Sequence, residues 1–335
     1  MANEKLALVI GAAGGVGFET AKALIRHGWR VRALARDPSR APKLPGAQWK
    51  QGDALDRDDV LAASNGASVI VHAVNPPGYK NWPTLVLPML ANTIAAAESS
   101  GARIVLPGTI YNYGPDAFPL LREDDPQQPR TRKGKIRVAM EHALEEAAAR
   151  GVKTLILRGG DFFGPHGHSS WFSQGMVQAN APLRRVIYPG KRNAGHAFVY
   201  LPDFAETIAQ LLAREGDLAM FERYHFRGHA FGRGIEFAER IRLAADAPGA
   251  PIHDFPWPAV VALAPFVRLF REMVEMRYLW KHDVQLDNMK LVAFLGAEPH
   301  TPIDAALRAS LAALNVRPRE ASSIAKEAFA PGRAR

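Results

Sequence analysis

The chain contains no cysteine among its 335 residues. This absence excludes disulfides, thiolate metal sites, iron–sulfur clusters and cysteine nucleophiles. No apolar run approaches the length needed to cross a bilayer, and residues 1–5 lack the basic and then apolar layout of a secretory signal. Redox chemistry must therefore come from a bound cofactor, and we expect a cytoplasmic protein with no membrane partner.

Acidic residues are fewer than basic ones, which gives a formal net charge of +9. The basic residues are spread along the chain and are not interleaved with aromatic ones, so we expect no nucleic-acid partner. Hydrophobic residues make up 47% of the chain, enough for one large core and a smaller attached lobe. The densest basic group consists of Arg130, Arg132, Lys133, Lys135 and Arg137.

The first half of the chain alternates short β-type apolar runs with longer helical patterns. This alternation predicts an α/β fold, a doubly wound parallel Rossmann sheet, with an NAD(P)-binding domain over residues 1–159. The expected strands are residues 6–10, 30–35, 48–51, 69–73, 103–107 and 154–158. The expected helices are residues 16–27, 57–63, 84–99 and 136–150.

After residue 159 the alternation breaks up into stretches rich in glycine, proline and aromatic residues. We expect residues 160–316 to form mostly a substrate lobe, with some elements returning to the Rossmann domain, and residues 317–335 to be a basic tail. Residues 259–270 are strongly apolar, but Arg268 interrupts them and they are too short to span a membrane. They are expected within one helix, residues 258–276, that is buried or caps a pocket.

A glycine-rich loop directly follows the first expected strand and opens a helix. Glycines at its turns allow the backbone to approach a pyrophosphate and allow the helix to pack close to the strand. The helix N-terminus then faces the negative charge of the phosphates. The residues expected to contact the cofactor here are Gly11, Ala13, Gly14, Gly15, Val16 and Gly17.

The second expected strand ends next to Arg36, where the adenosine ribose of a dinucleotide lies. A carboxylate at this place suits the 2′-hydroxyl of NAD, whereas a guanidinium suits the 2′-phosphate of NADP. We therefore predict NADP(H) as the cofactor. Asp37 follows at once and keeps NAD possible, and Arg32 is a second candidate for the phosphate.

Two further strand ends contribute candidates for the cofactor site. Asp53 and Ala54 follow the third strand, where the carboxylate could accept from the adenine amino group or could belong to a simple loop before a helix capped by Asp56. The fourth strand closes on small and turn-forming residues, as expected beside a dinucleotide. They are Ala73, Val74 and Asn75.

Together these residues resemble the extended short-chain dehydrogenase/reductase superfamily, which includes sugar-nucleotide epimerases, dehydratases and dihydroflavonol-type reductases. The resemblance covers about residues 6–314. Its anchors are Gly11-x-x-Gly14-x-x-Gly17, Gly52-Asp53-Ala54-Leu55, Tyr113-Gly114, Leu157-Arg158, Phe163-Gly164-Pro165, the run from His196 to Asp203, Leu286-Asp287-Asn288 and Leu295-Gly296.

The resemblance implies that Thr109, four residues before Tyr113-Gly114, holds the substrate oxygen. Members of the superfamily then use a Tyr-x-x-x-Lys pair for proton transfer, and none of the seven tyrosines here has lysine at the fourth following position. Alignment puts Lys133 where the tyrosine belongs and Arg137 where the lysine belongs. Lys133 could donate a proton if its neighbours Lys135 and Arg137 disfavour the ammonium form. Alternatively, Tyr111 or Tyr113 could supply the phenol. In a third interpretation Lys133 and Lys135 are solvated residues at a helix start and Arg137 holds the cofactor ribose or phosphate.

Three functions fit this pattern. The leading one is an NADP(H)-dependent oxidoreductase of carbonyl or alcohol substrates. The others are an epimerase or dehydratase that retains its cofactor and a non-catalytic dinucleotide sensor similar to the NmrA-like regulators. The resemblance also implies a homodimer, and we expect no metal site, since the histidine pairs His166/His168 and His225/His229 have no evident third ligand.

Overall fold

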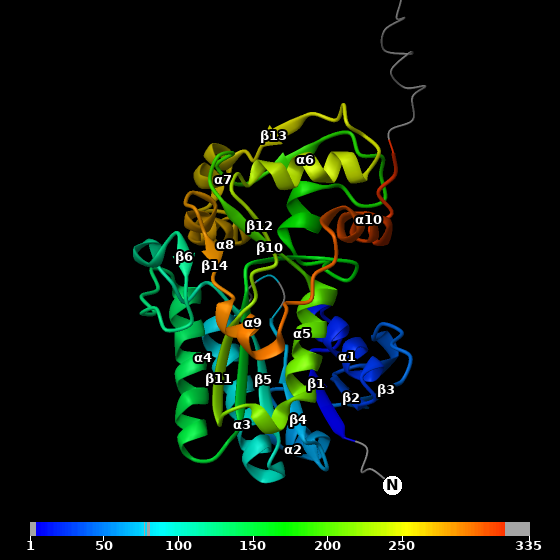
Figure 1. The fold of residues 1–335 in the computed structure, drawn as a ribbon, viewed down its shortest axis with the longest axis vertical. Coiled ribbons are helices and arrows are strands. Elements are labelled where there is room, and N and C mark those ends of the chain that lie inside the picture. Colours follow the sequence, from blue (N-terminus) through cyan, green and yellow to red (C-terminus); the bar gives the residue numbers. More distant parts are fainter. Residues whose placement is uncertain (1–4, 77, 79–80, 319–335) are drawn as a thin grey trace, which may run out of the picture.

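A seven-stranded parallel sheet forms the centre of the computed structural model, which describes residues 5–76, 78 and 81–318 (Figure 1). Its strand order is β3-β2-β1-β4-β5-β7-β11, so the predicted doubly wound Rossmann sheet is confirmed. The strands are β1 (Leu6–Ile10), β2 (Arg30–Ala35), β3 (Ala47–Gln51), β4 (Val69–His72), β5 (Arg103–Thr109), β7 (Thr154–Gly159) and β11 (Phe221–His225).

Helices cover both faces of the sheet, and its central strands are therefore buried on both sides. In β1, Ala7 and Val9 belong to one apolar core, and Leu8 and Ile10 belong to the other. The first core includes α1 (Gly15–Arg26) and α5 (Leu201–Ala213). The second includes α2 (Arg57–Ser64), α3 (Trp82–Ser100) and α4 (Arg132–Ala149).

Smaller sheets and helices gather at the other end of the molecule (Figure 1). The sheets have the orders β12-β10-β8, β13-β9 and β14-β6. Their strands are β6 (Leu120–Leu121), β8 (Asp161–Phe163), β9 (Val186–Tyr188), β10 (His196–Tyr200), β12 (His229–Phe231), β13 (Ile252–Asp254) and β14 (Gln285–Leu286). The helices of this part are α6 (Ile235–Ala244), α7 (Trp257–Leu263), α8 (Arg268–Met276) and α10 (Ile303–Ala313), whereas α9 (Met289–Leu295) returns to the large sheet, where Leu291 packs in the first core (Figure 1).

The predicted strands of the first half match the structure to within two residues at each end. The one strand of the large sheet that the sequence analysis does not predict is β11, which pairs with β7 in parallel and forms one edge of that sheet. Charged Glu222 and Arg223 interrupt its apolar pattern, and an edge strand tolerates them because it is only partly covered.

The segment expected as one buried or pocket-capping helix differs from the prediction. It forms two helices, α7 and α8, and the turn between them leaves Phe266 85% exposed. Pro265 lies in this turn and has no backbone N–H, so it cannot continue the first helix. Within the described part of the chain, no helix combines the length and hydrophobicity needed to cross a bilayer.

Of the expected basic tail, residues 319–335 lie outside the described part of the chain. Arg317 is joined to the substrate lobe by backbone hydrogen bonds. Its N–H donates to the Ala181 carbonyl at 3.1 Å, and its carbonyl accepts from Leu183 N–H at 2.9 Å.

Candidate active site

The glycine loop after β1 is packed so closely that side chains have no room at three of its positions. Gly11 has a φ of +90°, and a Cβ there would lie 2.6 Å from the backbone of Ala73 at the end of β4. A Cβ at Gly15 would lie 2.6 Å from the His166 carbonyl, and one at Gly17 would collide with the Gly11 carbonyl. The loop therefore runs between the end of β4 and the segment 164–168.

Helix α1 begins in this loop without a side-chain cap. Gly14 is its N-cap residue, and the first turn contains no acidic side chain. The first backbone N–H groups of a helix have no partner within it, and the helix dipole favours negative charge at this end. This N-terminus therefore fits the pyrophosphate of a dinucleotide, as the sequence predicts.

The tip of β2 carries an exposed guanidinium next to an exposed carboxylate, one oxygen of which accepts two hydrogen bonds. Asp37 Oδ1 accepts from the Ser39 backbone N–H at 3.0 Å and from the Ser39 hydroxyl at 2.6 Å. Arg36 beside it is exposed. Arg32 donates at 2.6 Å to the Ala63 carbonyl near the C-terminus of α2, so its guanidinium is held at a helix end instead of the ribose position.

The loop after β3 is held by its own carboxylates. Asp53 Oδ1 accepts from the Leu55 backbone N–H at 3.0 Å, which makes a local turn around Ala54. Asp56 caps α2 by accepting from two backbone N–H groups of its first turn, as expected. Asp53 is thus a turn residue whose second carboxylate oxygen could still contact an adenine.

The end of β4 places a buried histidine beside the candidate nicotinamide region. His72 Nδ1 lies 2.7 Å from the Thr93 hydroxyl. Burial, and then the positive charge of Arg137, lower the pKa of His72 to about 3. Arg137 itself packs over the Trp82 ring at 5.1 Å. Beyond His72, Ala73 and Val74 are half-buried and Asn75 is exposed.

Thr109 is the last residue of β5 and is half-buried. Its hydroxyl accepts a long hydrogen bond, 3.4 Å, from the backbone N–H of Tyr111. Tyr111 is also half-buried, and its carbonyl lies where a Cβ at Gly134 would be. The end of β5 therefore meets the first turn of α4, which brings Thr109 and Tyr111 close to the helix that carries Lys133 and Arg137.

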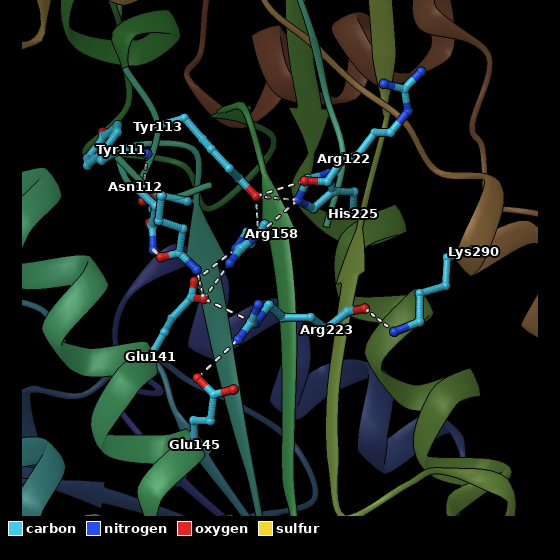
Figure 2. A network of polar contacts seen from close by, with 12 residues as sticks. Tyr111, Asn112, Tyr113, Arg122, Glu141, Glu145, Arg158, Arg223, His225 and Lys290 are labelled. Carbon is cyan, nitrogen blue, oxygen red and sulfur yellow. Dashed lines mark hydrogen bonds and ion pairs between the residues drawn. The ribbon is translucent and has the colours of Figure 1, made fainter. Parts of the chain in front are cut away.

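The phenol of Tyr113 points into a buried polar network (Figure 2). It donates to the Arg122 carbonyl at 3.0 Å, accepts from the Arg158 guanidinium, and lies 3.3 Å from His225 Nε2. The residue is 0% exposed, and burial raises the pKa of its phenol. This position leaves the Tyr113 hydroxyl out of reach of a substrate.

The network is centred on a buried ion pair between Arg158 and Glu141 (Figure 2). Arg158 Nε donates to Glu141 Oε1 at 2.9 Å, and the second nitrogen of the fork binds the other oxygen. Arg223 lies 3.5 Å from the same carboxylate. The sequence analysis names Arg158 only as a motif position, because its partnership with Glu141 joins β7 to α4 and is visible only in three dimensions.

Lys133 is neither solvated nor surrounded by other cations. It is 2% exposed at the start of α4, and its ammonium contacts two carboxylates of α8, Glu272 and Glu275, the latter at 2.8 Å. It also donates to the Glu272 carbonyl at 3.1 Å. Burial tends to raise the pKa of Glu275, but the hydrogen bonds from Lys133 and its charge, with Arg132, lower it overall.

The histidines of the pairs His166/His168 and His225/His229 make contacts with other residues. His166 is bound to the buried Glu19 of α1 and packs on Phe18 at 3.9 Å, whereas His225 belongs to the Arg158 network. His229 lies against His300 at 4.4 Å. Among the residues that the structure describes, no group of three or more His, Cys, Asp or Glu side chains is arranged to hold a metal ion.

The model of the NAD dependent epimerase/dehydratase family matches residues 7–222 of the chain. Among solved structures, MoeE5 in complex with UDP-glucose and NAD is similar, with a TM-score of 0.71 and 19% sequence identity. The alignment covers 92% of this chain and 97% of that one. At this level of identity the likeness shows the fold.

Two characterised proteins are similar in sequence. A 3-diazoavenalumate denitrifying reductase from Streptomyces sp is 31% identical over 173 residues, which are 47% of this chain and 56% of that protein. The chain thus matches only slightly more than half the length of that relative. Cinnamoyl-CoA reductase 1 from Oryza sativa subsp. japonica is 27% identical over 272 residues, 72% of this chain and 75% of that enzyme.

Proposed function

The chain belongs to the NAD-dependent epimerase/dehydratase family, and from this premise we propose that it is an NADP(H)-dependent oxidoreductase of carbonyl or alcohol substrates. The observation that supports the proposal is the exposed guanidinium of Arg36 at the tip of β2, beside Asp37, whose Oδ1 already accepts from the backbone N–H and the hydroxyl of Ser39. A guanidinium binds a 2′-phosphate well, whereas NAD is best bound by a carboxylate that accepts from its 2′-hydroxyl.

The dinucleotide would be held by residues from five strand ends and from α4. The pyrophosphate lies on the loop of Gly11, Ala13, Gly14 and Gly15 and on the N-terminus of α1, with Val16 and Gly17 in its first turn. Arg36 binds the 2′-phosphate, and Asp53 and Ala54 face the adenine. Ala73, Val74 and Asn75 line the nicotinamide side together with Thr109 and Arg137. When bound, the cofactor supplies a nicotinamide that exchanges a hydride with a substrate carbon.

Thr109 holds the substrate oxygen in this proposal, and Tyr111 is the proton donor. An ammonium has three N–H donors, and Lys133 has three acceptors around it, two carboxylates and one carbonyl. The Tyr113 phenol is occupied in the Arg158 network. Tyr111 is half-buried and lies two residues after Thr109 along the chain.

The test is steady-state turnover of NADPH and NADP⁺ on a panel of aldehydes, ketones and the matching alcohols. We expect net oxidation or reduction of added cofactor, and we expect Thr109→Val to lower kcat/KM about 100-fold. Cofactor that co-purifies and cycles without net redox change would instead indicate an epimerase or dehydratase. Binding with no turnover on any substrate would indicate a sensor.

A second candidate substrate class is an acceptor that takes up hydride without needing a proton. Reduction of an aryl diazonium replaces N₂ with hydrogen and consumes one hydride and no proton, so it needs no phenol in the site. Tyr113 is hydrogen-bonded to Arg158 and Lys133 is ion-paired with Glu275, so neither side chain is placed to donate a proton to a substrate. An acceptor that needs no proton fits this arrangement, and one sequence relative is named a denitrifying reductase of a diazo compound. Release of N₂ from an aryl diazonium substrate in a Tyr111→Phe variant would support this class.

Three expectations about the whole protein stay predictions: that it is a homodimer, that it is located in the cytoplasm and that it has no nucleic-acid partner. Light scattering at several protein concentrations tests the first of them.

A further inference from the structure

Exposed apolar side chains are concentrated on the hairpin formed by α7 and α8. Eleven large apolar residues of the described chain are exposed, and five of them fall within residues 261–269. Phe266, at the turn, is 85% exposed. We call this set the apolar hairpin surface: Val261, Leu263, Phe266, Val267 and Leu269. A cluster of exposed apolar side chains on a protein surface marks a site of contact with another protein or with a membrane.

The hairpin is held firmly from its inner side. Val260 and Ala264 are 4% and 8% exposed, so α7 packs against the protein with one face and leaves the other outside. On α8, Glu272 and Glu275 contact Lys133 at the start of α4. The apolar hairpin surface is therefore presented by a structure that is anchored to the substrate lobe and to the Rossmann half.

Arginines lie beside this surface, where the inner side of the hairpin faces the start of α4. Arg130, Arg132 and Arg271 line a hollow of about 340 Å³ together with Ala264 of the hairpin. Arg130 lies 3.7 Å from Asp116, and Arg132 lies 3.4 Å from both Glu272 and Glu275. The side chains of Arg130 and Arg132 are 69% and 68% exposed, whereas Asp116 is 34% exposed and the two glutamates, which also contact Lys133, are 12% exposed. Arg271 is exposed as well, so positive charge predominates on the outside of the rim.

From this combination we propose that the apolar hairpin surface docks the protein onto an anionic membrane surface. Apolar side chains at the tip enter the region between headgroups and acyl chains, while arginines bind lipid phosphates at the rim. A second copy of the chain fits less well, because a two-fold contact through the hairpin would bring both sets of arginines to one interface. The docking is peripheral and needs no membrane-spanning helix.

The hairpin also adjoins the candidate active site, since α8 contacts Lys133 next to the junction of β5 and α4. Docking through α7 and α8 would hold this side of the site close to the lipid surface (Figure 1). The proposal does not depend on the redox function, because the surface and its rim lie on the outside of the protein.

Flotation of the full-length protein with lipid vesicles tests the proposal. We expect it to float with vesicles of phosphatidylcholine and phosphatidylglycerol, and at least tenfold less with pure phosphatidylcholine vesicles. The variant Phe266→Asp/Leu269→Asp should lose at least tenfold in binding, because a charge at an apolar membrane contact is unfavourable. Arg271→Glu should weaken binding to the anionic vesicles and leave the weak binding to neutral ones unchanged.

Met289→Asp is the matched control, since Met289 is 72% exposed on α9 and outside the hairpin. It should bind vesicles as the wild type does. Thermal unfolding and cofactor binding of all variants should equal those of the wild type, which excludes misfolding. The proposal is overturned if the wild type does not float with anionic vesicles or if the Phe266→Asp/Leu269→Asp variant floats equally well. It is also overturned if that variant instead changes the molecular mass in solution, which would make the surface a contact between copies.

Discussion

Lys133 Nζ lies 2.8 Å from Glu275 Oε2, across the junction between α4 and α8. The alignment with the superfamily puts this lysine at the position of the proton-donating tyrosine, but its contacts are those of a structural link. Removing the ammonium would leave the carboxylates of Glu272 and Glu275, each 12% exposed, with only the longer contact to Arg132 at 3.4 Å. A partly buried charge that loses its partner is costly.

We predict that Lys133→Met lowers the free energy of unfolding by about 3 kcal/mol. Urea unfolding followed by circular dichroism measures this change. Lys135→Met is the control, because Lys135 is exposed two residues away, and it should change stability by less than about 0.5 kcal/mol. Equal stability of the Lys133 variant and the wild type would show that the link to α8 contributes little.

The two candidate tyrosines should separate cleanly. Tyr111→Phe should lower kcat about 100-fold on a carbonyl substrate, because it removes the proposed proton donor. Its thermal stability should stay close to that of the wild type. Tyr113→Phe should lower the thermal stability and leave kcat close to that of the wild type. It removes a hydroxyl that accepts from Arg158 and donates to the Arg122 carbonyl. Steady-state kinetics and thermal unfolding of both variants decide between them.

Low pH should destabilise the protein through its buried histidines. Burial and the charge of Arg158 lower the pKa of His225 to about 3. His225 Nδ1 lies 3.1 Å from the Leu121 carbonyl, so Nδ1 donates, and Nε2 is left to accept from Arg158 at 3.1 Å. Protonation would put an N–H and a positive charge against the guanidinium.

The sign follows from the depressed pKa. Below about pH 6.5 the unfolded chain binds a proton at His225 that the folded protein does not, so stability is lost as pH falls toward the folded pKa. We predict that between about pH 6.5 and about pH 4 the wild type loses about 1.4 kcal/mol per pH unit more than His225→Asn. Urea unfolding across this range measures the difference. Parallel pH profiles would contradict a neutral buried His225.

Gly15→Ala should weaken cofactor binding specifically. A Cβ at this position would lie 2.6 Å from the His166 carbonyl, so the loop or the segment 164–168 must move away from the pyrophosphate position. We expect at least a tenfold rise in the Kd of NADPH. Gly216→Ala is the control, because nothing lies within 4 Å of a Cβ there. An unchanged Kd in Gly15→Ala would mean that the close approach of this segment does not matter for binding.

The fold of the first half could be predicted closely because its signals are local. Strand β1 is buried on both faces and reads as a continuous apolar run, and the glycines of the following loop stand where turns and close packing require them. Asp56 was recognised as a helix cap for the same reason. Strand β11 could not be recognised, because an edge strand that carries Glu222 and Arg223 has neither apolar continuity nor clear alternation.

The candidate site was harder to predict, because its contacts join distant segments. Tyr111 and Tyr113 both lie within four residues of Thr109, so the sequence alone does not distinguish their roles. Only the fold shows that Tyr113 is buried against Arg158. Lys133 is charged in a basic stretch, and its acidic partners lie about 140 residues later, on α8. Long-range ion pairs of this kind leave no local pattern.

The cofactor preference is the central claim, and a fluorescence titration of NADPH and NADH tests it most directly. The wild type should bind NADPH at least tenfold more tightly than NADH. Arg36→Ala should remove that difference, which corresponds to at least about 1.4 kcal/mol. If NADH binds as tightly as NADPH to the wild type, Arg36 does not bind a 2′-phosphate and the assignment of NADP(H) is wrong.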